Sequence, residues 1–378
     1  MTFSGEEHSR RWNAVRSLMA AQEVETLVVF GGRGAGHEVQ YLSGYAVSGE
    51  ALLVVPAAGN PVLLVHHYNH VPDARRLSVV EDVRPRGPDA VVAAIAQLTR
   101  GAAWGAVGIA GPLSYQAYQA LGAGLGPRRP LRDLQPGLTA LRYRKSNEEL
   151  ALVRRGAALS DSALRALRDA ARPGATEHDL IATVEGAYLA QGGSTHIHFV
   201  GATPMSKPDL CVPRQFPTSR RLAAGDVVLT ELSASCDGYY GQVLRTLTVA
   251  AEPDDAYRRM HELAVAVYDD AVGRIRPGAR SGAVLDAAEP IHEAGYTICD
   301  DLLHFAVGGV YGPALRTRRT TAGPPPDFVF EEGMVLVVQP NVVTPDFRTG
   351  VQVGEMLVVT ANGVESLHRV PREILRCG

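Results

Sequence analysis

A long amphipathic segment that begins near Lys145 sets the organisation of the second half of the chain. There the sequence SNEEL places a serine three residues before a glutamate, which is the capping-box pattern of a helix start. Apolar residues recur at helical spacing up to Pro173, and a second helix is expected from Thr176 to about Gly193. Three strand-like runs follow directly: HIHFVGA, DVVLTELSA and YYGQVLRTLTVA. This order predicts a mixed α/β (α+β) domain in which two helices precede long strands.

The first part of the chain shows a different alternation. Glu7 to Ala21 has helical spacing, Thr26 to Phe30 is a short β-rich run, and Ala51 to His66 has the pattern of a hairpin that turns at AAGN. A chain of 378 residues is about two and a half times as long as a usual single domain. Two domains are therefore expected, over residues 1–138 and 139–378.

The end of the chain returns to helices and then to strands. The pattern predicts helices from Tyr257 to Ile275 and from Ala283 to Ala294, followed by a β-meander from Met334 to Leu367. Within the meander, the stretch VQPNVVTPDFRTGVQVGE has the pattern of two strands joined by a turn, and each strand carries a glutamine, Gln339 and Gln352. These two neutral amides raise the question of what they replace.

Composition and charge exclude several classes of protein. The net charge of −3 comes without the basic stripe of a nucleic-acid binder, so no nucleic-acid partner is expected. No run approaches the ~18 apolar residues of a membrane span, and the N-terminus lacks an apolar core after its charges. A cytoplasmic protein without membrane partners is therefore expected. The four cysteines lack any CxxC pair, which indicates free thiols in a reducing compartment: Cys211, Cys236, Cys299 and Cys377.

Six segments of the second half, taken in order, resemble the pita-bread family of creatinase, aminopeptidase P, prolidase and ectoine hydrolase. They are LRYRKSNEELALVRRGAALSDSALRAL, RPGATEHDLIATVE, AAGDVVLTELSAS, GYYGQVLRTLTV, EEGMVLVVQPNV and GVQVGEMLVVTANG. The earlier stretch HEVQYLSGYAVSGEALLVVP resembles the N-terminal domain of the same family. The resemblance implies an N-terminal creatinase-like α/β domain followed by a C-terminal pita-bread domain, and a homodimer.

The metallopeptidase members of this family hold two metal ions with Asp, Asp, His, Glu and Glu, in that order along the chain. The resemblance places these five ligand positions on Glu231, Gln242, His304, Gln339 and Gly354. Gln339 thus stands where the family has a ligand. Gln352 lies two residues before a ligand position that is now glycine.

These replacements argue against a two-metal site on physical grounds. Two divalent cations a few ångströms apart repel each other, and bridging carboxylates normally offset that repulsion. Here one carboxylate and one imidazole are left, and an amide oxygen is a weak ligand for Mn, Co or Zn. Glu355 follows Gly354 directly but points to the opposite face of a strand. A single ion held by Glu231 and His304 is an alternative, although two protein ligands are fewer than the three that a catalytic zinc site normally uses. We expect no metal and no other cofactor.

The remaining pocket is expected to work by proton transfer. Glu231 lies in the apolar run LTELS, where burial raises the pKa of a carboxyl group toward the range useful for a general acid or base. His304 is the expected partner near neutral pH. Structural alternatives are a buried salt bridge from Glu231 to Arg245, and a core position for His304. Donors and acceptors for a polar ligand are expected from three amides: Gln242, Gln339 and Gln352.

Four further residues are expected to bind substrate. His196 and His198 alternate on one strand and should share a face, which suits a ligand pair but also an ordinary polar face. Arg214 falls near the position of the catalytic histidine of creatinase, which would change the preferred charge of the substrate. Tyr240 belongs to GYYGQVLRT, which resembles a strand of creatinase.

Three classes of function follow. The first is a metal-independent hydrolase of a C–N bond in a small amide or amidine-like compound, with Glu231 and His304 as general acid and base. The second is a lyase, cyclase or isomerase of a biosynthetic pathway, because the same two groups can move a proton without water. The third is a non-catalytic pseudo-enzyme or binding protein. A metal-dependent Xaa-Pro aminopeptidase ranks last, because its ligands are missing.

Overall fold

The structure is a computed structural model that describes residues 3–34, 36–87, 90–98, 105–126, 129–307 and 311–378. The chain divides into two compact units, of which the first ends at Arg142 and the second begins at Tyr143. Each unit has its own sheet.

The first unit is a mixed sheet with helices, within the described residues. The strand order is β4-β3-β2-β1-β5-β6, with β1 antiparallel to β2 and parallel to β5. The strands are β1 (Val24–Gly32), β2 (Glu50–Pro56), β3 (Val62–Val65), β4 (Asp82–Pro85), β5 (Ala106–Ala110) and β6 (Leu131–Asp133). The helices are α1 (Gly5–Ala21), α2 (Glu38–Ser43), η1 (Tyr68–His70), α3 (Val71–Leu77), α4 (Ala90–Leu98), α5 (Tyr115–Leu125) and α6 (Gln135–Ala140).

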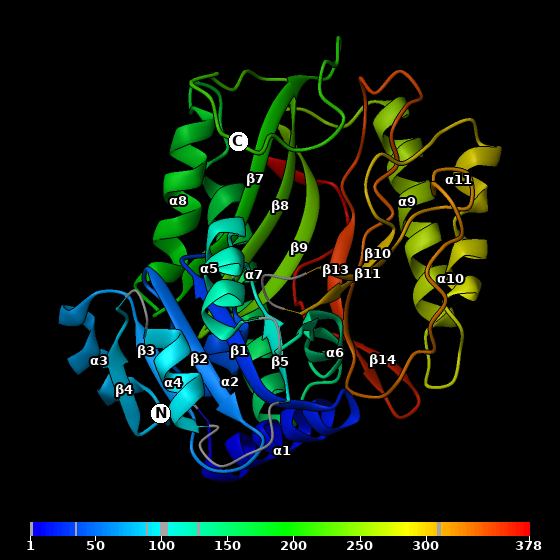
Figure 1. Ribbon diagram of the computed structural model, residues 1–378. Coiled ribbons are helices and arrows are strands. Elements are labelled where there is room, and N and C mark those ends of the chain that lie inside the picture. Colours follow the sequence, from blue (N-terminus) through cyan, green and yellow to red (C-terminus); the bar gives the residue numbers. More distant parts are fainter. Residues whose placement is uncertain (1–2, 35, 88–89, 99–104, 127–128, 308–310) are drawn as a thin grey trace. The chain divides into compact units, whose positions relative to one another are not determined.

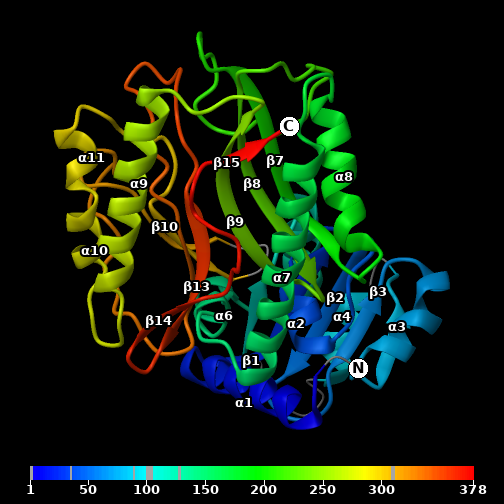
Figure 2. The same cartoon turned by 180° about the vertical axis from the view of Figure 1, so that it is seen from behind.

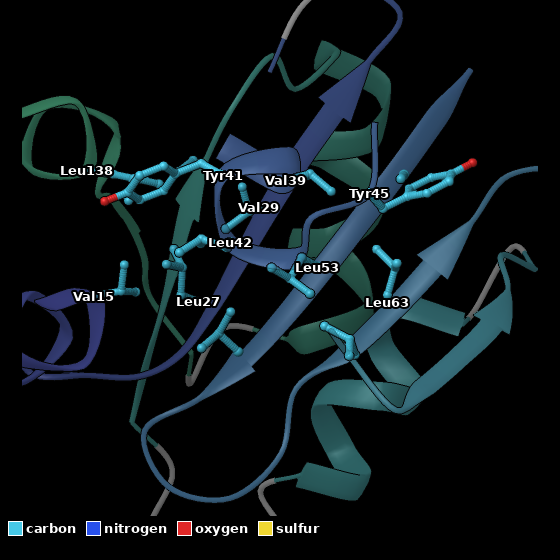
Figure 3. Packing of buried hydrophobic residues seen from close by; sticks show 14 of the residues in the cluster. Val15, Leu27, Val29, Val39, Tyr41, Leu42, Tyr45, Leu53, Leu63 and Leu138 are labelled. Carbon is cyan, nitrogen blue, oxygen red and sulfur yellow. The ribbon is translucent and has the colours of Figure 1, made fainter. Parts of the chain in front are cut away.

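An apolar core fixes the order of these elements. Figure 3 shows Val15 of α1 and Leu138 of α6 on one side of Leu27 and Val29, which project from β1. Leu53 of β2 continues the same cluster toward β3. Alternate residues of β1 point to the opposite face, where a second cluster includes residues of α4 and α5. The central strands are therefore buried on both faces, which explains their nearly continuous apolar sequence.

The second unit opens with two capped helices, as the sequence predicts. In α7 (Asn147–Ala170) the Ser146 hydroxyl accepts a hydrogen bond from the Glu149 N–H, and the Glu149 carboxylate accepts one from the Ser146 N–H. In α8 (Glu177–Leu189) Thr176 and Asp179 form the same reciprocal pair. Each box satisfies two backbone N–H groups that a helix start leaves without partners.

The sheet of the second unit has nine strands, within the described residues, in the order β11-β10-β12-β13-β9-β8-β7, with β14 on β13 and β15 on β9. Figure 1 shows β7, β8 and β9 as long curved neighbours. The strands are β7 (Ser194–Pro204), β8 (Asp226–Cys236), β9 (Tyr239–Val249), β10 (Leu303–Ala306), β11 (Tyr311–Leu315), β12 (Val335–Val338), β13 (Gly354–Thr360), β14 (Gly363–Ser366) and β15 (Leu375–Cys377). The remaining helices are α9 (Asp255–Arg274), α10 (Gly282–Ala287) and α11 (Glu289–Glu293).

Helices cover one face of this sheet. Figure 2, seen from behind, shows α7 lying along β8 and β9. The approach is so close that a Cβ atom on Gly241 of β9 would lie 2.2 Å from the Cα atom of Ala157 in α7. Glycine is therefore required at position 241 by the distance between the backbones. The alternate side chains of β8 and β9 point to the opposite face of the sheet.

The helix-covered face also holds a fully buried ion pair. The Arg245 guanidinium, which is 0% exposed, donates to the carboxylate of Glu355 and to the carbonyl oxygens of Gly354, Val370 and Pro371. Glu355 thus points away from the face that Gly354 shares with Leu244, as expected. The salt bridge of Arg245 is with Glu355, so the structural alternative of a pair with Glu231 is wrong.

One sequence expectation about local structure needs correction. The helix expected from Ala283 to Ala294 is two short helices, α10 and α11, joined at Ala288. Pro290 lies in the first turn of α11, where its missing N–H costs nothing, whereas inside one continuous helix it would remove a hydrogen bond. Among the described helices, none is long and apolar enough to cross a lipid bilayer.

Candidate active site

Strand register brings four of the predicted site residues to the same face of the nine-stranded sheet. Glu231 on β8 is directly opposite Leu244 on β9, so Gln242, two residues earlier on β9, shares its face. Gly354 pairs with Leu244 from the other side. His304 on β10 and Gln339, which follows β12, have the same orientation by the registers of β10 and β13 with β12. These residues come from segments that are far apart in the sequence.

A chain of hydrogen bonds links the two glutamines to two carboxyl groups. The Gln242 Nε2 atom donates to Glu231 Oε1 at 2.9 Å and to Gln339 Oε1 at 3.2 Å. The Gln339 Nε2 atom in turn donates to Asp300 Oδ2 at 3.1 Å. The side-chain amides of both glutamines therefore have a fixed orientation, because the Nε2 atom of each donates to a carboxyl oxygen.

Asp300 is a site residue that sequence reasoning missed. It lies in the loop before β10, within the acidic pair CDD, and no motif marks it. Its carboxyl group is half-buried, and desolvation raises its pKa. The only available signal was an acidic doublet next to the apolar run LLHF, and that signal is weak.

Burial governs the electrostatics of Glu231. The residue is 8% exposed, and the only hydrogen bond to its carboxyl group within the described residues comes from the neutral amide of Gln242. Desolvation, with a smaller contribution from the negative charge of Asp300, raises the pKa of Glu231 to about 8. The carboxyl group is thus mostly protonated at neutral pH and can act as an acid.

His304 is shifted in the opposite direction. The ring is 4% exposed, and burial lowers its pKa below the ordinary value of 6.5. A hydrogen bond with the side chain of Gln339 and the charges of Asp300 and Asp301 oppose this effect without overcoming it. The Nδ1 atom lies 3.4 Å from the carbonyl oxygen of Phe305. At neutral pH the imidazole is neutral and available as a base.

The residues at the family's ligand positions do not fit a two-metal centre. Within the described ranges, no three His, Cys, Asp or Glu side chains gather in an arrangement that could hold a metal ion. A Cβ atom on Gly354 would lie 2.8 Å from both Gln339 Cβ and Leu244 Cδ1, so those two side chains close the space next to this position. Two amides and a protonated carboxyl group supply little negative charge to offset two cations.

Two further polar side chains on this face are buried without partners. Gln352 is 1% exposed, and its backbone N–H donates to the Thr246 hydroxyl at 2.7 Å. Its side-chain Oε1 and Nε2 atoms have no hydrogen-bond partner among the described residues, and the same holds for the hydroxyl of Ser233, which faces Gln242 across the strands. A buried amide without partners costs about 1–3 kcal/mol per group, so such groups are typical of ligand-binding positions.

His196 and His198 do not share a face, which corrects the expectation from their spacing. A register shift between Thr195 and Ile197 adds a residue to β7 and turns the intervening side chain over. The ring of His196 consequently stacks on Tyr240, with 4.1 Å between ring centroids.

His198 belongs to the helix-covered side. Its Nε2 atom is 2.8 Å from the Tyr188 hydroxyl of α8, and its Nδ1 atom accepts from the Ser233 N–H at 3.3 Å. Burial lowers the pKa of His198 to about 4, so the ring stays neutral. These contacts are those of a structural residue.

Arg214 lies over β7 rather than beside the glutamines. Its side chain packs on Gly201, where a Cβ atom would be 2.8 Å from Arg214 Cγ. Its Nε atom is 3.5 Å from Glu177 Oε1 at the start of α8. Among the described residues, its ion pair is with Glu177, and no contact joins it to Glu231 or Gln242.

Comparison with known proteins identifies relatives of this chain. The model of metallopeptidase family M24 matches residues 151–361, and that of the creatinase/prolidase N-terminal domain matches residues 11–143. An Xaa-Pro dipeptidase of Pyrococcus furiosus is 26% identical over 71% of this chain and 75% of its own length. An uncharacterized hydrolase/peptidase of Sinorhizobium fredii is 25% identical over 98% of this chain and 97% of its own length.

Solved structures show the same fold. An X-Pro aminopeptidase from Thermotoga maritima superimposes with a TM-score of 0.83 at 18% identity, covering 97% of this chain and 99% of that one. An Xaa-Pro dipeptidase from Bacillus anthracis gives 0.81 at 18% identity, covering 98% and 99%. The expected creatinase-like domain followed by a pita-bread domain is confirmed. Because the first family model spans more than half of the sequence, this protein is a member of metallopeptidase family M24, a family of hydrolases, with a creatinase/prolidase N-terminal domain.

Proposed function

We propose that this protein hydrolyses a C–N bond in a small amide or amidine-like compound, with Glu231 as general acid and His304 as general base, and without a two-metal centre. The observation that carries the proposal is that strand register places two buried titratable groups, Glu231 and His304, on one face of the sheet, where burial shifts their pKa values in opposite directions. The pKa of the carboxyl group is raised to about 8, while the pKa of the imidazole is lowered below 6.5. Two titratable groups displaced in this way are typical of an acid and a base that must both be uncharged at neutral pH.

The proposed reaction balances with these two groups and one water molecule. His304 takes a proton from the water, whose oxygen forms a bond to the carbon of the C–N group. Glu231 gives its proton to the nitrogen, and the C–N bond breaks to release an amine. Exchange of a proton between the charged imidazolium, solvent and the carboxylate restores both groups. Activity should therefore rise with pH as His304 loses its proton and fall near pH 8 as Glu231 loses its own.

The substrate class rests on the neutral polar groups around the acid. Gln242 donates to the carboxyl group without adding charge and also donates to Gln339, and the buried amide of Gln352 has both a donor and an acceptor to offer. Such groups suit an uncharged amide or amidine-like compound better than an anion. The other residues predicted to bind substrate, His196, Tyr240 and Arg214, stay predictions, as do the homodimer and the cytoplasmic location.

A second candidate is hydrolysis of Xaa-Pro peptides, and the comparisons favour it. Two of the relatives described above carry the name Xaa-Pro dipeptidase, and one of them aligns with three-quarters of its length. The proposed acid and base would act on a peptide bond by the same steps. The two candidates differ in substrate size and in whether added metal is needed.

The test is an assay of amine release by protein stripped of metal with a chelator and then dialysed. The panel contains small amides, cyclic amides, amidines and Xaa-Pro dipeptides, each with and without added Mn²⁺, Co²⁺ or Zn²⁺. We expect turnover of a small C–N compound by the stripped protein, unchanged by metal. Turnover confined to Xaa-Pro dipeptides in the presence of metal would overturn the proposal in favour of the second candidate. Glu365→Gln, on an exposed ion pair with Arg154, is the matched control and should keep full activity.

A further inference from the structure

Gln352 lies on the face of the nine-stranded sheet that carries the proposed acid. Gly354 pairs with Leu244 of β9, and Leu244 pairs in turn with Glu231 of β8. Two residues before Gly354, the N–H of Gln352 donates to the Thr246 hydroxyl at 2.7 Å, and the Gln352 carbonyl oxygen accepts from the same hydroxyl at 3.2 Å. These bonds continue the register of β13 with β9, so the side chain of Gln352 is on the same face as Glu231.

The side-chain amide of Asn341 lies next to Gln352. The register of β12 with β13 continues to the pair of Val343 and Gly350, which places Asn341 opposite Gln352. The Asn341 Oδ1 atom accepts from the N–H of Val353 at 3.3 Å, one residue after Gln352. Asn341 and Gln352 are each 1% exposed, so both amides are removed from bulk water.

The two amides hold polar atoms without partners among the described residues. These atoms are Nδ2 of Asn341 and both Nε2 and Oε1 of Gln352. The free atom of Asn341 is a donor, because its oxygen accepts from a backbone N–H. For Gln352, an exchange of oxygen and nitrogen would leave the same pair, one donor beside one acceptor. Because a buried polar group without a partner costs about 1–3 kcal/mol, a ligand that supplies the missing partners is favoured.

The pattern of donors and acceptors selects the shape of that ligand. A donor beside an acceptor on Gln352 is complementary to a second amide whose N–H and C=O lie on the same side of its C–N bond. Primary amides, lactams and cyclic ureas have this cis edge, and their carbonyl oxygen has a second lone pair that can accept from Asn341 Nδ2. An ordinary peptide bond is trans, so its N–H and C=O point in opposite directions.

Charged groups do not match this pattern. A carboxylate offers two acceptors and leaves the Gln352 Oε1 atom without a donor, whereas an amidinium offers two donors and leaves Nε2 without an acceptor. The peptide bond of an Xaa-Pro dipeptide has no N–H at all. Each of these ligands would leave at least one buried atom of Gln352 unpaired.

We propose that Gln352 and Asn341 form a subsite that binds the cis-amide edge of an uncharged lactam, primary amide or cyclic urea on the face that carries Glu231. Gln352 donates to the carbonyl oxygen of the ligand and accepts from its N–H, and Asn341 donates to the same carbonyl oxygen. The inference rests on the proposed function for the place of this ligand in the reaction. It narrows the small C–N compounds to those that have a cis N–H and C=O.

The experiment measures binding by the metal-stripped full chain, with three small amides as ligands in saturation-transfer NMR titrations. They are 2-pyrrolidinone, which has the cis edge, N-methyl-2-pyrrolidinone, which lacks the N–H, and N-methylacetamide, which is trans. We expect the Kd of 2-pyrrolidinone to be lower than the other two by about tenfold or more, because each of the others leaves a buried polar atom unpaired. Equal affinity for the three, or no binding of 2-pyrrolidinone, would overturn the inference.

Binding is measured without turnover, so a failure of the subsite and a failure of the proposed function can be told apart. Tight binding of 2-pyrrolidinone by a protein that hydrolyses no C–N compound would support the subsite and overturn the proposed function. Turnover of small C–N compounds without a preference for the cis edge would overturn the subsite alone.

Two variants test the residues one at a time. Gln352→Met keeps the length of the side chain and removes both polar atoms, so we expect 2-pyrrolidinone to bind about tenfold more weakly or worse. Its melting temperature should not fall below that of the parent, because apolar atoms replace unpaired polar ones. Asn341→Asp keeps the acceptor for the Val353 N–H and removes the free donor, so it should also weaken binding.

Gln191→Met is the matched control, because it makes the same substitution at an exposed glutamine whose Nε2 atom donates to the Ala187 carbonyl oxygen. It should bind 2-pyrrolidinone as the parent does. A lower melting temperature in Gln352→Met together with unchanged binding would show that Gln352 is structural, and would contradict the assignment.

Discussion

The two faces of the nine-stranded sheet each bury a carboxyl group, and the two groups differ in their hydrogen-bond partners. On the helix-covered face, Glu355 accepts hydrogen bonds from Arg245, from the Tyr268 hydroxyl at 3.2 Å and from the Ser366 hydroxyl at 2.8 Å. On the opposite face, Glu231 accepts one hydrogen bond from the neutral amide of Gln242.

The difference separates a structural carboxylate from a chemical one. The buried pair of Arg245 and Glu355, with its several hydrogen-bond partners, holds chain segments together, here β9, β13 and the segment of Val370 and Pro371. A buried carboxyl group without a cation instead changes its protonation state. The face that carries Glu231 therefore has a protonated carboxyl group in place of the negative charges that a two-metal centre needs.

The largest expected effect is a loss of stability when the buried ion pair of the helix-covered face is broken. Arg245→Met leaves the buried Glu355 with only the more distant guanidinium of Arg372, 3.9 Å away, and leaves several carbonyl oxygens without a donor, so it should lower the free energy of unfolding by about 3–5 kcal/mol. Urea denaturation measures this loss. Arg154→Met, which removes an exposed ion pair with Glu365, is the control and should cost less than about 1 kcal/mol. Equal losses in the two variants would refute the distinction.

On the face opposite the helices, Glu231→Gln removes the proposed acid but preserves the size of the side chain and its hydrogen bond with Gln242. We expect kcat to fall by about 10²–10⁴, because this is the usual contribution of a general acid. KM should change little, since the amide of Gln242 can still donate to the new oxygen. A variant with parental kcat would show that the carboxyl proton takes no part in the reaction.

The same variant should become more stable than the parent in alkali. The folded pKa of Glu231 is raised from 4.5 to about 8, so the stability that its protonated form contributes is present below pH 4.5 and is lost as pH rises through 8. The amide that replaces the carboxyl group cannot lose a proton. The free energy of unfolding of Glu231→Gln should therefore rise relative to that of the parent between pH 4.5 and 8, by on the order of a few kcal/mol. Melting curves from pH 4 to 9 measure the gain. A constant difference across that range would contradict a raised pKa.

Gly354→Ala tests whether the former ligand position is closed. The added Cβ would meet Gln339 Cβ and Leu244 Cδ1 at 2.8 Å, so we expect a loss of about 1–3 kcal/mol from overpacking. The double variant Gly354→Ala/Leu244→Ala should lose less than the sum of the two single variants, because Leu244 then gives way. Additive losses in urea denaturation would show that the two side chains do not compete for this space.

The smallest expected effect is a shift of a pH profile. Asp300→Asn removes the negative charge that helps to raise the pKa of Glu231, so the alkaline limb of kcat/KM should move to lower pH. Asp301→Asn is the neighbouring control, because Asp301 is paired with Arg316 and makes no hydrogen bond to Gln339. A shift of the same size in both variants would mean that the effect is not specific to Asp300.

Much of this molecule could be predicted from local sequence signals. The boxes at Ser146 and Thr176 fix the starts of α7 and α8, and the ordered motifs fix the fold. The burial of Glu231 also followed from its strand, in which apolar residues lie on both sides of Glu231.

What sequence reasoning could not reach depends on contacts between distant segments. Asp300 is part of the site because it accepts a hydrogen bond from Gln339, and no spacing of residues in the sequence predicts that contact. The register shift in β7 places His196 and His198 on different faces. It arises from the pairing of β7 with β8 and cannot be predicted from the sequence of β7 alone. The pairing of Arg245 with Glu355 likewise needs two strands to be neighbours before it can be seen.

The most direct test of the account is an infrared titration of Glu231, with Glu231→Gln as the reference that assigns the carboxyl C=O band. We expect the band of the protonated acid to be present at neutral pH, to disappear with a midpoint near 8 and to stay unchanged when stoichiometric Zn²⁺ or Mn²⁺ is added. A midpoint close to the ordinary 4.5, or loss of the band when metal is added, would contradict it and return this protein to metal-dependent chemistry.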